Sequence, residues 1–250
     1  MSQDHIVIVT GGSTGLGLAL LDNFNVSYDN QLLVNIARRD CPIKAASERG
    51  NQLLNLRADM HDPASITQLQ SELQALLQKH QPNKLSVIHN AGQVTPMGLC
   101  TQLTDINQID QAFRLNISSV IALNASLLST LPQNIDARML LISSGAGRGP
   151  VPGWAVYGAT KAAMDYYAQV LNQEQPQLRC VSLAPGVIDT DMQGTIRGHS
   201  ADKFPPIERF LQLHEQQQLQ SPTETARSIV DYLLSDGFGS KVIDDIRQHL

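Results

Sequence analysis

Two residues with complementary chemistry, Tyr157 and Lys161, stand four positions apart, and Ser144 lies thirteen positions before the tyrosine. Residues four apart share one face of a helix, which would place an ammonium beside a phenol. A phenol can give a proton to a carbonyl oxygen, but its reference pKa of about 10 requires help near neutral pH. Lys161 would help by stabilising the phenolate, while the Ser144 hydroxyl would hold the carbonyl. The three residues therefore predict proton transfer at a carbonyl or an alcohol.

A glycine-rich turn at residues 10–17 predicts a binding site for a dinucleotide. It follows a short β-branched run at residues 6–9 and precedes an apolar pattern typical of a helix at residues 18–24. Backbone amides at such a helix start can face a pyrophosphate, and missing side chains permit close approach. The residues expected to form this cradle are Gly11, Ser13, Thr14, Gly15, Leu16 and Gly17.

Strand and helix patterns alternate along the chain and must position these residues. Apolar runs predict further strands at about residues 32–37, 53–56, 85–89, 139–142 and 180–184, with a long helical region at about 105–131. Asp62-Pro63 and the capping box at residues 221–224 are typical helix starts. Strands that are apolar almost throughout imply a parallel sheet covered on both faces. We therefore expect one α/β domain over residues 1–250, a Rossmann-like doubly wound sheet of about seven strands.

The segment at about residues 190–220 interrupts this alternation, because it is polar and contains Pro205-Pro206. An insertion here would lie at the carboxyl ends of the strands, where open sheets bind ligands. We expect a helical flap over the substrate; a surface excursion without function is the alternative.

Composition argues against several classes of function. The formal net charge of −5 leaves no basic stripe for nucleic acid. The three cysteines are far apart and the seven histidines lack ligand spacing, so no metal site is expected. The polar start is unlike a targeting segment, and no apolar run approaches membrane-spanning length. We expect a soluble, cytoplasmic protein with neither nucleic acid nor membrane as a partner.

The end of the second predicted strand indicates which dinucleotide is bound. An enzyme that uses NAD is expected to offer an acidic residue there to the adenosine ribose, whereas this chain has Arg38 and Arg39. A guanidinium binds a 2′-phosphate through charge-assisted hydrogen bonds. The pair predicts NADPH/NADP⁺ over NADH; an ordinary solvated pair of arginines is the alternative.

The glycine turn, the serine and the tyrosine–lysine pair together resemble the short-chain dehydrogenase/reductase family over nearly the whole chain. The resemblance implies that Tyr157 is the acid/base and that Lys161 also holds the nicotinamide ribose. It implies that Ser144 hydrogen-bonds the substrate oxygen and that Asn116 supports a proton-relay water. From the residues alone, Ser143 could replace Ser144 if the strand ended one residue earlier, and Asn116 could simply meet water or a neighbouring carbonyl.

The same resemblance implies further contacts and an assembly. Asp59 would contact the adenine. A homodimer through the Asn116 and Tyr157 helices is expected, although tetramers are also common among relatives. Other residues expected to line the cofactor are Asn90, Ala91, Gly92, Pro185, Gly186, Val187 and Thr190.

Residues 143–147, 153–157 and 185–192 are more specific, being similar to family members that reduce sepiapterin and, more closely, benzil. This similarity implies an NADPH-dependent reductase of one carbonyl in an aromatic or vicinal diketone, giving an α-hydroxyketone. The substrate pocket would contain Val151, Trp154, Met192 and Phe204.

The residues also allow other interpretations of the pocket and of the function. Trp154 could instead pack against the flap or a subunit interface. Sepiapterin reductases anchor the pterin through an Asp near the C-terminus, and residues 242–245 place acids there out of clean register. An alcohol dehydrogenase of the same family is a further alternative. A non-catalytic NADP(H)-binding sensor is the last, and the complete set of Ser144, Tyr157 and Lys161 argues against it.

Overall fold

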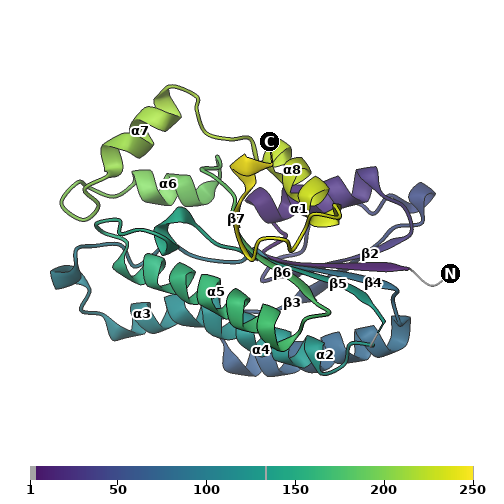
Figure 1. Cartoon of the computed structure of the whole chain (residues 1–250). Helices are drawn as coiled ribbons and strands as arrows, with labels where there is room; N and C mark the ends of the chain where they lie inside the picture. The colour runs from purple at the N-terminus through teal and green to yellow at the C-terminus, as the bar shows by residue number, and fades with distance from the viewer. Residues whose placement is uncertain (1–3, 133, 250) are drawn as a thin grey trace.

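Seven parallel strands form one sheet in the order β3-β2-β1-β4-β5-β6-β7 (Figure 1). The computed structural model describes residues 4–132 and 134–249, so positions 1–3, 133 and 250 of the expected domain lie outside the described residues. The strands are β1 (His5–Thr10), β2 (Gln31–Ala37), β3 (Gln52–Arg57), β4 (Lys84–His89), β5 (Asp136–Ile142), β6 (Arg179–Ala184) and β7 (Ile243–Asp245). The predicted doubly wound α/β fold is confirmed.

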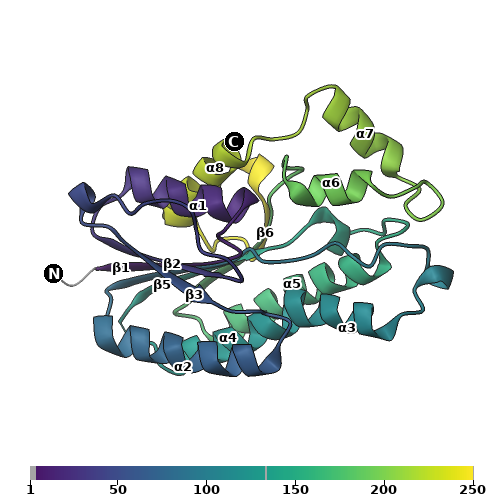
Figure 2. The same ribbon diagram turned by 180° about the vertical axis from the view of Figure 1, so that it is seen from behind.

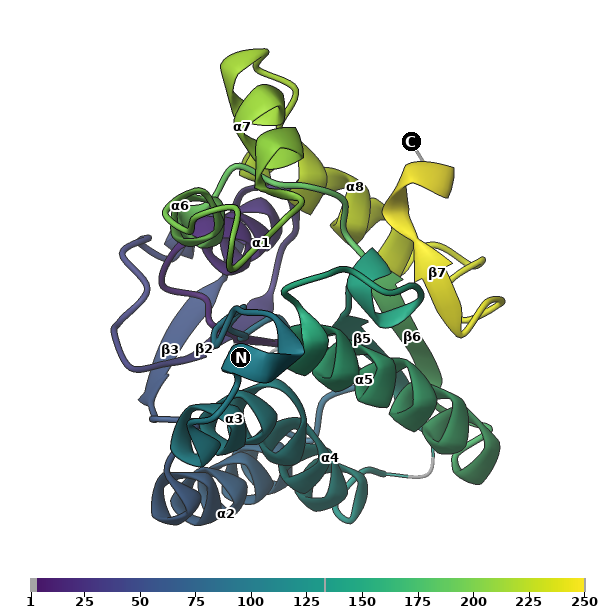
Figure 3. The ribbon, with the colours of Figure 1, turned by 90° about the vertical axis from the view of Figure 1, so that its left-hand side faces the viewer.

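Helices cover both faces of the sheet, as Figures 2 and 3 show from behind and end-on. One face packs against α1 and α8, and the other against α2, α4 and α5. Both faces of the central strands are therefore buried, which explains their nearly continuous apolar sequences. The helices are α1 (Gly15–Ser27), α2 (Pro63–His80), α3 (Ile106–Phe113), α4 (Ser119–Leu128), α5 (Ala155–Glu174), α6 (Asp191–Arg197), α7 (Ile207–Glu215) and α8 (Pro222–Leu234).

Helix starts follow the capping residues that the sequence offers. The Asp62 carboxylate accepts hydrogen bonds from the amides of Ala64 (3.2 Å) and Ser65 (3.1 Å), with Pro63 at the first helical position. Ser221 accepts from the Glu224 amide (3.5 Å) at the start of α8. Both helices start where predicted, because an oxygen there satisfies an amide that has no partner within the helix. Of the capping box predicted at residues 221–224, only the bond from the Glu224 amide to Ser221 is found within the described residues.

The long helical region expected near residues 105–131 is divided in two. A π-helical turn, Arg114–Ser118, separates α3 from α4 and contains Asn116. Such turns insert an extra residue into the helical repeat and are frequent at functional sites. Apolar spacing alone does not reveal this turn, because residues on either side keep a helical pattern.

The segment expected as a flap forms α6 and α7, which lie beyond the carboxyl ends of the strands (Figure 1). Its apolar side chains Ile196, Phe204, Ile207 and Phe210 are buried against Trp154 and Tyr157. Among residues 4–132 and 134–249, no helix combines the length and the apolar character needed to cross a membrane.

Candidate active site

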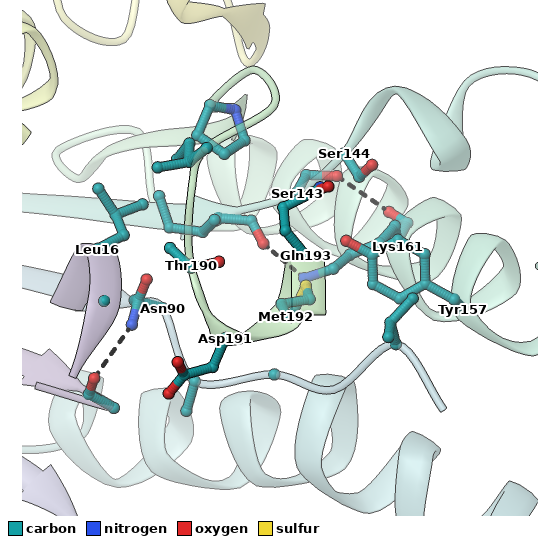
Figure 4. A pocket seen from close by; sticks show the side chains of 18 of the residues that line it. Leu16, Asn90, Ser143, Ser144, Tyr157, Lys161, Thr190, Asp191, Met192 and Gln193 are labelled. Carbon is teal, nitrogen blue, oxygen red and sulfur yellow. Dashed lines mark hydrogen bonds between the residues drawn. The ribbon is translucent and has the colours of Figure 1, made fainter. Parts of the chain in front are cut away.

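A cavity of about 680 Å³ lies at the carboxyl ends of the strands, beneath the flap. Figure 4 shows Ser144, Tyr157 and Lys161 together at one end of it, and Leu16, Asn90 and Thr190 toward the other. This position is where open parallel sheets bind their ligands, since the chain leaves β1 and β4 in opposite directions there. The glycine turn and the tyrosine–lysine pair, far apart in the sequence, therefore share one cavity.

The glycine turn is shaped as a cradle without side chains. Gly11 and Gly15 have φ values of 72° and 56°, which favour glycine. A Cβ on Gly17 would collide with the Gly11 carbonyl, so Gly17 shapes the turn without lining the cavity. The other cradle residues expected from the sequence, Ser13, Thr14 and Leu16, do line it. The turn fits a pyrophosphate lying against backbone amides at the start of α1.

Asn90 fixes the position of this turn relative to β4. Its side-chain amide donates to the carbonyls of Thr10 (3.0 Å) and Gly11 (3.4 Å), while Thr10 Oγ1 accepts from the amides of Asn90 and Ala91 (3.0 Å each). Ala91 and Gly92 continue the wall of the cavity. A Cβ on Gly92 would lie 3.2 Å from Asn116 Oδ1, so the wall passes close to the π turn.

Two arginines that follow β2, Arg38 and Arg39, line the cavity. Arg38 and Arg39 are exposed, and within the described part of the chain neither forms an ion pair. The nearby carboxylate of Asp40 is instead held by Arg57 through hydrogen bonds of 2.7 and 2.6 Å. Positive charge at this end is therefore available to an anionic ligand.

Asp59 lines the same end and is half exposed. Its Oδ1 accepts hydrogen bonds from the backbone amide and the ring Nδ1 of His61, both at 3.0 Å. These bonds, with the His61 amide as the strongest influence and the charge of Arg38 as a further one, lower the pKa of Asp59. The carboxylate thus stays ionised and oriented beside the expected adenine position.

Tyr157 and Ser144 face each other at the deep end of the cavity. Burial raises the pKa of the Tyr157 phenol, and a hydrogen bond with Ser144 acts in the opposite direction. Ser144 follows β5 and caps the 3₁₀ turn Gly145–Gly147, accepting from the Ala146 amide at 3.2 Å. Ser143 points elsewhere, since its hydroxyl donates to Asp165 Oδ1 at 2.7 Å. The geometry therefore favours Ser144 over Ser143 as the residue that contacts a carbonyl.

Lys161 lies one helical turn after the tyrosine and is 4% exposed. Its Nζ donates to the Ile142 carbonyl at 2.7 Å and is 5.6 Å from the centroid of the Tyr157 ring. Burial lowers the pKa of Lys161 to about 8, while the carboxylate of Asp165 opposes this shift. An ammonium with few competing partners can act strongly on a neighbouring phenolate.

Asn116 does not line the cavity. Its amide Nδ2 donates to the Gln93 carbonyl (2.9 Å) and to Thr160 Oγ1 (3.0 Å), and its Oδ1 accepts from the Gln93 amide (2.9 Å). The side chain thereby ties the cavity wall at residues 90–93 to α5. Its position is determined by the π turn, which the sequence pattern did not predict.

The nicotinamide side of the expected cofactor site is bounded by the loop after β6. Pro185, Gly186, Val187 and Thr190 all line the cavity. Gly186 has a φ of 84°, and a Cβ on Gly15 would lie 3.3 Å from Thr190 Cγ2. The loop after β6 and the glycine turn therefore approach each other closely across the cavity.

The expected substrate residues divide into two groups. Val151, Trp154 and Met192 line the cavity, but Phe204 does not, which corrects the expectation. Phe204 is fully buried because its ring stacks on the outer face of Trp154, with centroids 4.8 Å apart. Phe210 of α7 lines the cavity instead, 5.4 Å from the Trp154 ring. Trp154 was predicted either to line the substrate pocket or to pack against the flap, and it does both.

Several lining residues were missed by sequence reasoning. Gln193 and Arg209 lie on the flap helices, where helical spacing gives no sign of which side faces the sheet. Arg247 lies on the 3₁₀ turn Ile246–Gln248, which directly follows β7, a strand of only three residues without an apolar run. Asp245, which ends β7 and also lines the cavity, belongs to the acids at residues 242–245 that the sequence placed out of clean register. Within the described residues, no group of three or more His, Cys, Asp or Glu side chains could hold a metal ion.

Comparisons with known proteins agree with this geometry. The model of the short chain dehydrogenase family matches residues 5–201. A benzil reductase ((S)-benzoin forming) from Saccharomyces cerevisiae is 31% identical over 241 residues, covering 92% of this chain and 90% of the relative. A sepiapterin reductase from Meriones unguiculatus is 28% identical over 246 residues, covering 94% and 93%. The crystal structure of the KRED1-Pglu enzyme is 29% identical, with a TM-score of 0.79 and coverage of 92% and 95%. The family match spans the glycine turn, Ser144, Tyr157 and Lys161.

Proposed function

The chain belongs to the short-chain dehydrogenase/reductase family and is an oxidoreductase acting on CH–OH or C=O groups, and from this we propose that it is an NADPH-dependent carbonyl reductase. Its substrate class would be aromatic or vicinal diketones, one carbonyl of which becomes an alcohol. The observation that carries the proposal is the meeting of Ser144, Tyr157 and Lys161 in a cavity walled by Trp154 and Phe210.

The residues of the chain supply binding and proton transfer. The nicotinamide, when bound, supplies the hydride to the carbonyl carbon. Ser144 donates a hydrogen bond to the carbonyl oxygen, and Tyr157 gives its proton to the same oxygen as negative charge develops there. Lys161 stabilises the resulting phenolate and holds the ribose. The raised pKa of Tyr157 keeps the phenol protonated before transfer, so the lysine is needed at the moment when the proton leaves.

The preference for NADPH rests on Arg38 and Arg39. Both arginines line the cavity at the end of β2, and Arg57 holds the neighbouring Asp40 carboxylate. A 2′-phosphate would therefore meet uncompensated positive charge, whereas the hydroxyls of NADH would gain little from it.

The substrate class rests on the shape and lining of the deep end. The Trp154 ring lies beside Tyr157 and the Phe210 ring beside Trp154, and Val151 and Met192 add apolar surface. The benzil reductase relative supports a diketone with aromatic substituents as the compound to test first.

A pterin substrate is the second candidate, favoured by Asp245, which lines the cavity. Its carboxylate is already engaged, however, because Arg247 donates to Oδ1 at 2.8 Å and to Oδ2 at 2.5 Å. A pterin amine would have to displace that guanidinium. This competition ranks the pterin below the diketone.

The proposal also includes a homodimer in the cytoplasm. Ile121 of α4 and Tyr166 of α5 are exposed by 41% and 70%, which supports pairing through these helices. Light scattering tests the dimer, and fluorescent tagging in the source cell tests the location.

The deciding experiment follows the loss of NADPH absorbance with benzil, sepiapterin and a simple monoketone in parallel, with NADH as the control. Fast turnover of benzil with NADPH supports the proposal, and preference for sepiapterin moves the assignment to pterins. Preference for oxidation of an alcohol with NADP⁺ would favour the dehydrogenase alternative. Tight NADPH binding without any turnover would favour the sensor.

A further inference from the structure

A buried carboxylate, Asp165, lies on α5 one helical turn beyond Lys161 and is 7% exposed. Its Oδ1 accepts hydrogen bonds from Ser143 Oγ (2.7 Å) at the end of β5 and from Ser182 Oγ (2.6 Å) on β6. Its Oδ2 accepts from Arg148 Nε at 3.1 Å. The carboxylate therefore joins α5 to two strands and to the loop that follows Ser144.

Packing alone does not explain why a carboxylate is buried at position 165. Taking a carboxylate and a guanidinium out of water is costly, and apolar residues of similar volume often hold a fold equally well. The two serines and Arg148 satisfy both oxygens, so the site is built to keep the group charged. What distinguishes the location is that the charge lies beside Lys161, whose pKa it raises against the effect of burial.

The other charged groups near this set come from neighbouring elements. Arg148 also donates to the Ser182 carbonyl at 3.2 Å. The hydrogen bond from Arg247 is the main cause that lowers the pKa of Asp245 on β7, and the charge of Arg148 is a smaller one. Asp245 is in turn paired with Arg247. The strands β5 and β6 contribute only the neutral hydroxyls of Ser143 and Ser182 to the carboxylate. On the flap side, the charged residues that line the cavity are Asp191 and Arg209.

We propose that Asp165 is a positioning residue for proton transfer: it holds α5 against the Ser143–Ser144 segment and, balanced by Arg148, sets the electrostatic field at Lys161 and, through the lysine, at Tyr157. The inference rests on the proposed role of Tyr157 and Lys161. Neither Asp165 nor Arg148 lines the cavity, so both act through other residues.

Opposite charges give opposite expected effects. Asp165→Asn removes a negative charge and keeps an oxygen for the two serines, so the Lys161 ammonium is stabilised less and the phenolate of Tyr157 becomes harder to form. Arg148→Gln removes a positive charge and leaves the carboxylate uncompensated, so the ammonium is stabilised more and the phenolate becomes easier to form. Arg148→Lys keeps the charge and serves as the matched control. Each neutralising variant should move the titration midpoint of Tyr157 by about 0.5 pH unit or more.

The test is an ultraviolet titration of tyrosinate in the purified full-length protein, without substrate or nucleotide. Each titration is repeated on the same variant with Tyr157→Phe added. The difference between the two titration curves is the titration of Tyr157 alone. We expect a higher midpoint for Asp165→Asn, a lower one for Arg148→Gln and an unchanged one for Arg148→Lys. Midpoints that stay constant, or that move in the same direction for both neutralising variants, overturn the proposal and leave the network a purely structural role.

The titration remains informative if one variant does not fold or if the protein is inactive. If Asp165→Asn does not fold, as judged by circular dichroism, the comparison of Arg148→Gln with Arg148→Lys decides alone. Since no carbonyl compound enters the titration, a protein inactive toward every substrate tested would still show the opposite shifts. Failure of the proposed function and failure of this inference are therefore distinguishable.

Discussion

The two ends of the cavity use charge in opposite ways. At the adenosine end, Arg38 and Arg39 are exposed and form no ion pair within the described chain. At the catalytic end, Lys161 and Asp165 are buried and each is held by hydrogen bonds. Exposed charges are screened by water and salt, whereas buried ones act strongly over short distances. Substitutions at the catalytic end should therefore change rates greatly, and those at the adenosine end should change affinity moderately.

The largest difference between the two ends is expected from Tyr157→Phe. Loss of the phenolic proton should lower kcat by about 10²–10⁴-fold, the range that a positioned general acid contributes. The apolar ring remains, so its packing against Trp154 and the affinity for NADPH should persist. Steady-state kinetics with fluorescence titration of NADPH measure both quantities. Turnover within a few-fold of the parent protein would exclude Tyr157 as the acid.

Ser144 and Ser143 provide a comparison within the catalytic end. Ser144→Ala should lower kcat by about 10²-fold, because a hydrogen bond to the developing oxyanion is lost. Ser143→Ala should chiefly lower stability, by about 1 kcal/mol, since its hydroxyl serves Asp165. Kinetics and urea unfolding of the two variants separate these effects. Equal losses of kcat would show that the catalytic serine cannot be identified from the hydrogen bonds of the free protein.

At the adenosine end, Arg38→Glu should weaken NADPH binding by about 10–100-fold, the value of one charge-assisted hydrogen bond. Binding of NADH should change much less, because it lacks the phosphate. Arg227→Glu, at an exposed position outside the cavity lining, makes the same change in net charge and is the matched control. Binding titrations at two salt concentrations give the result, and equal weakening of NADPH and NADH would remove the phosphate assignment.

The sequence predicts the strands and helices better than the hydrogen bonds and side-chain contacts between them. Five strands are recognisable because burial on both faces makes them apolar. The edge strand β3 is only partly buried and is recognisable from its three leucines, whereas β7 is short and contains two aspartates. The residues proposed as catalytic are recognisable because their spacing lies within one segment or follows a family pattern. The partners of Asp165 are 22 and 17 positions away, and only the sheet brings them together. Phe204 and Phe210 look alike in sequence, and the packing of the flap alone decides that Phe210 faces the cavity.

The smallest expected effect is a dependence on pH that originates at the buried end. Burial lowers the pKa of Lys161 to about 8, so the ammonium is present below that pH and is lost as the pH rises through it. The phenolate then loses its nearest positive charge, and kcat/KM for reduction should fall by up to about tenfold per pH unit above 8. Lys161→Arg keeps a positive charge throughout this range, so its fall should begin at higher pH even though its absolute rate is lower. A fall at the same pH in both proteins would assign the titration to another group. If the pH at which kcat/KM falls is higher in Lys161→Arg than in the parent protein, the titrating group is the Lys161 ammonium. Burial of this ammonium, rather than the exposed arginines, then sets the pH range in which the enzyme works.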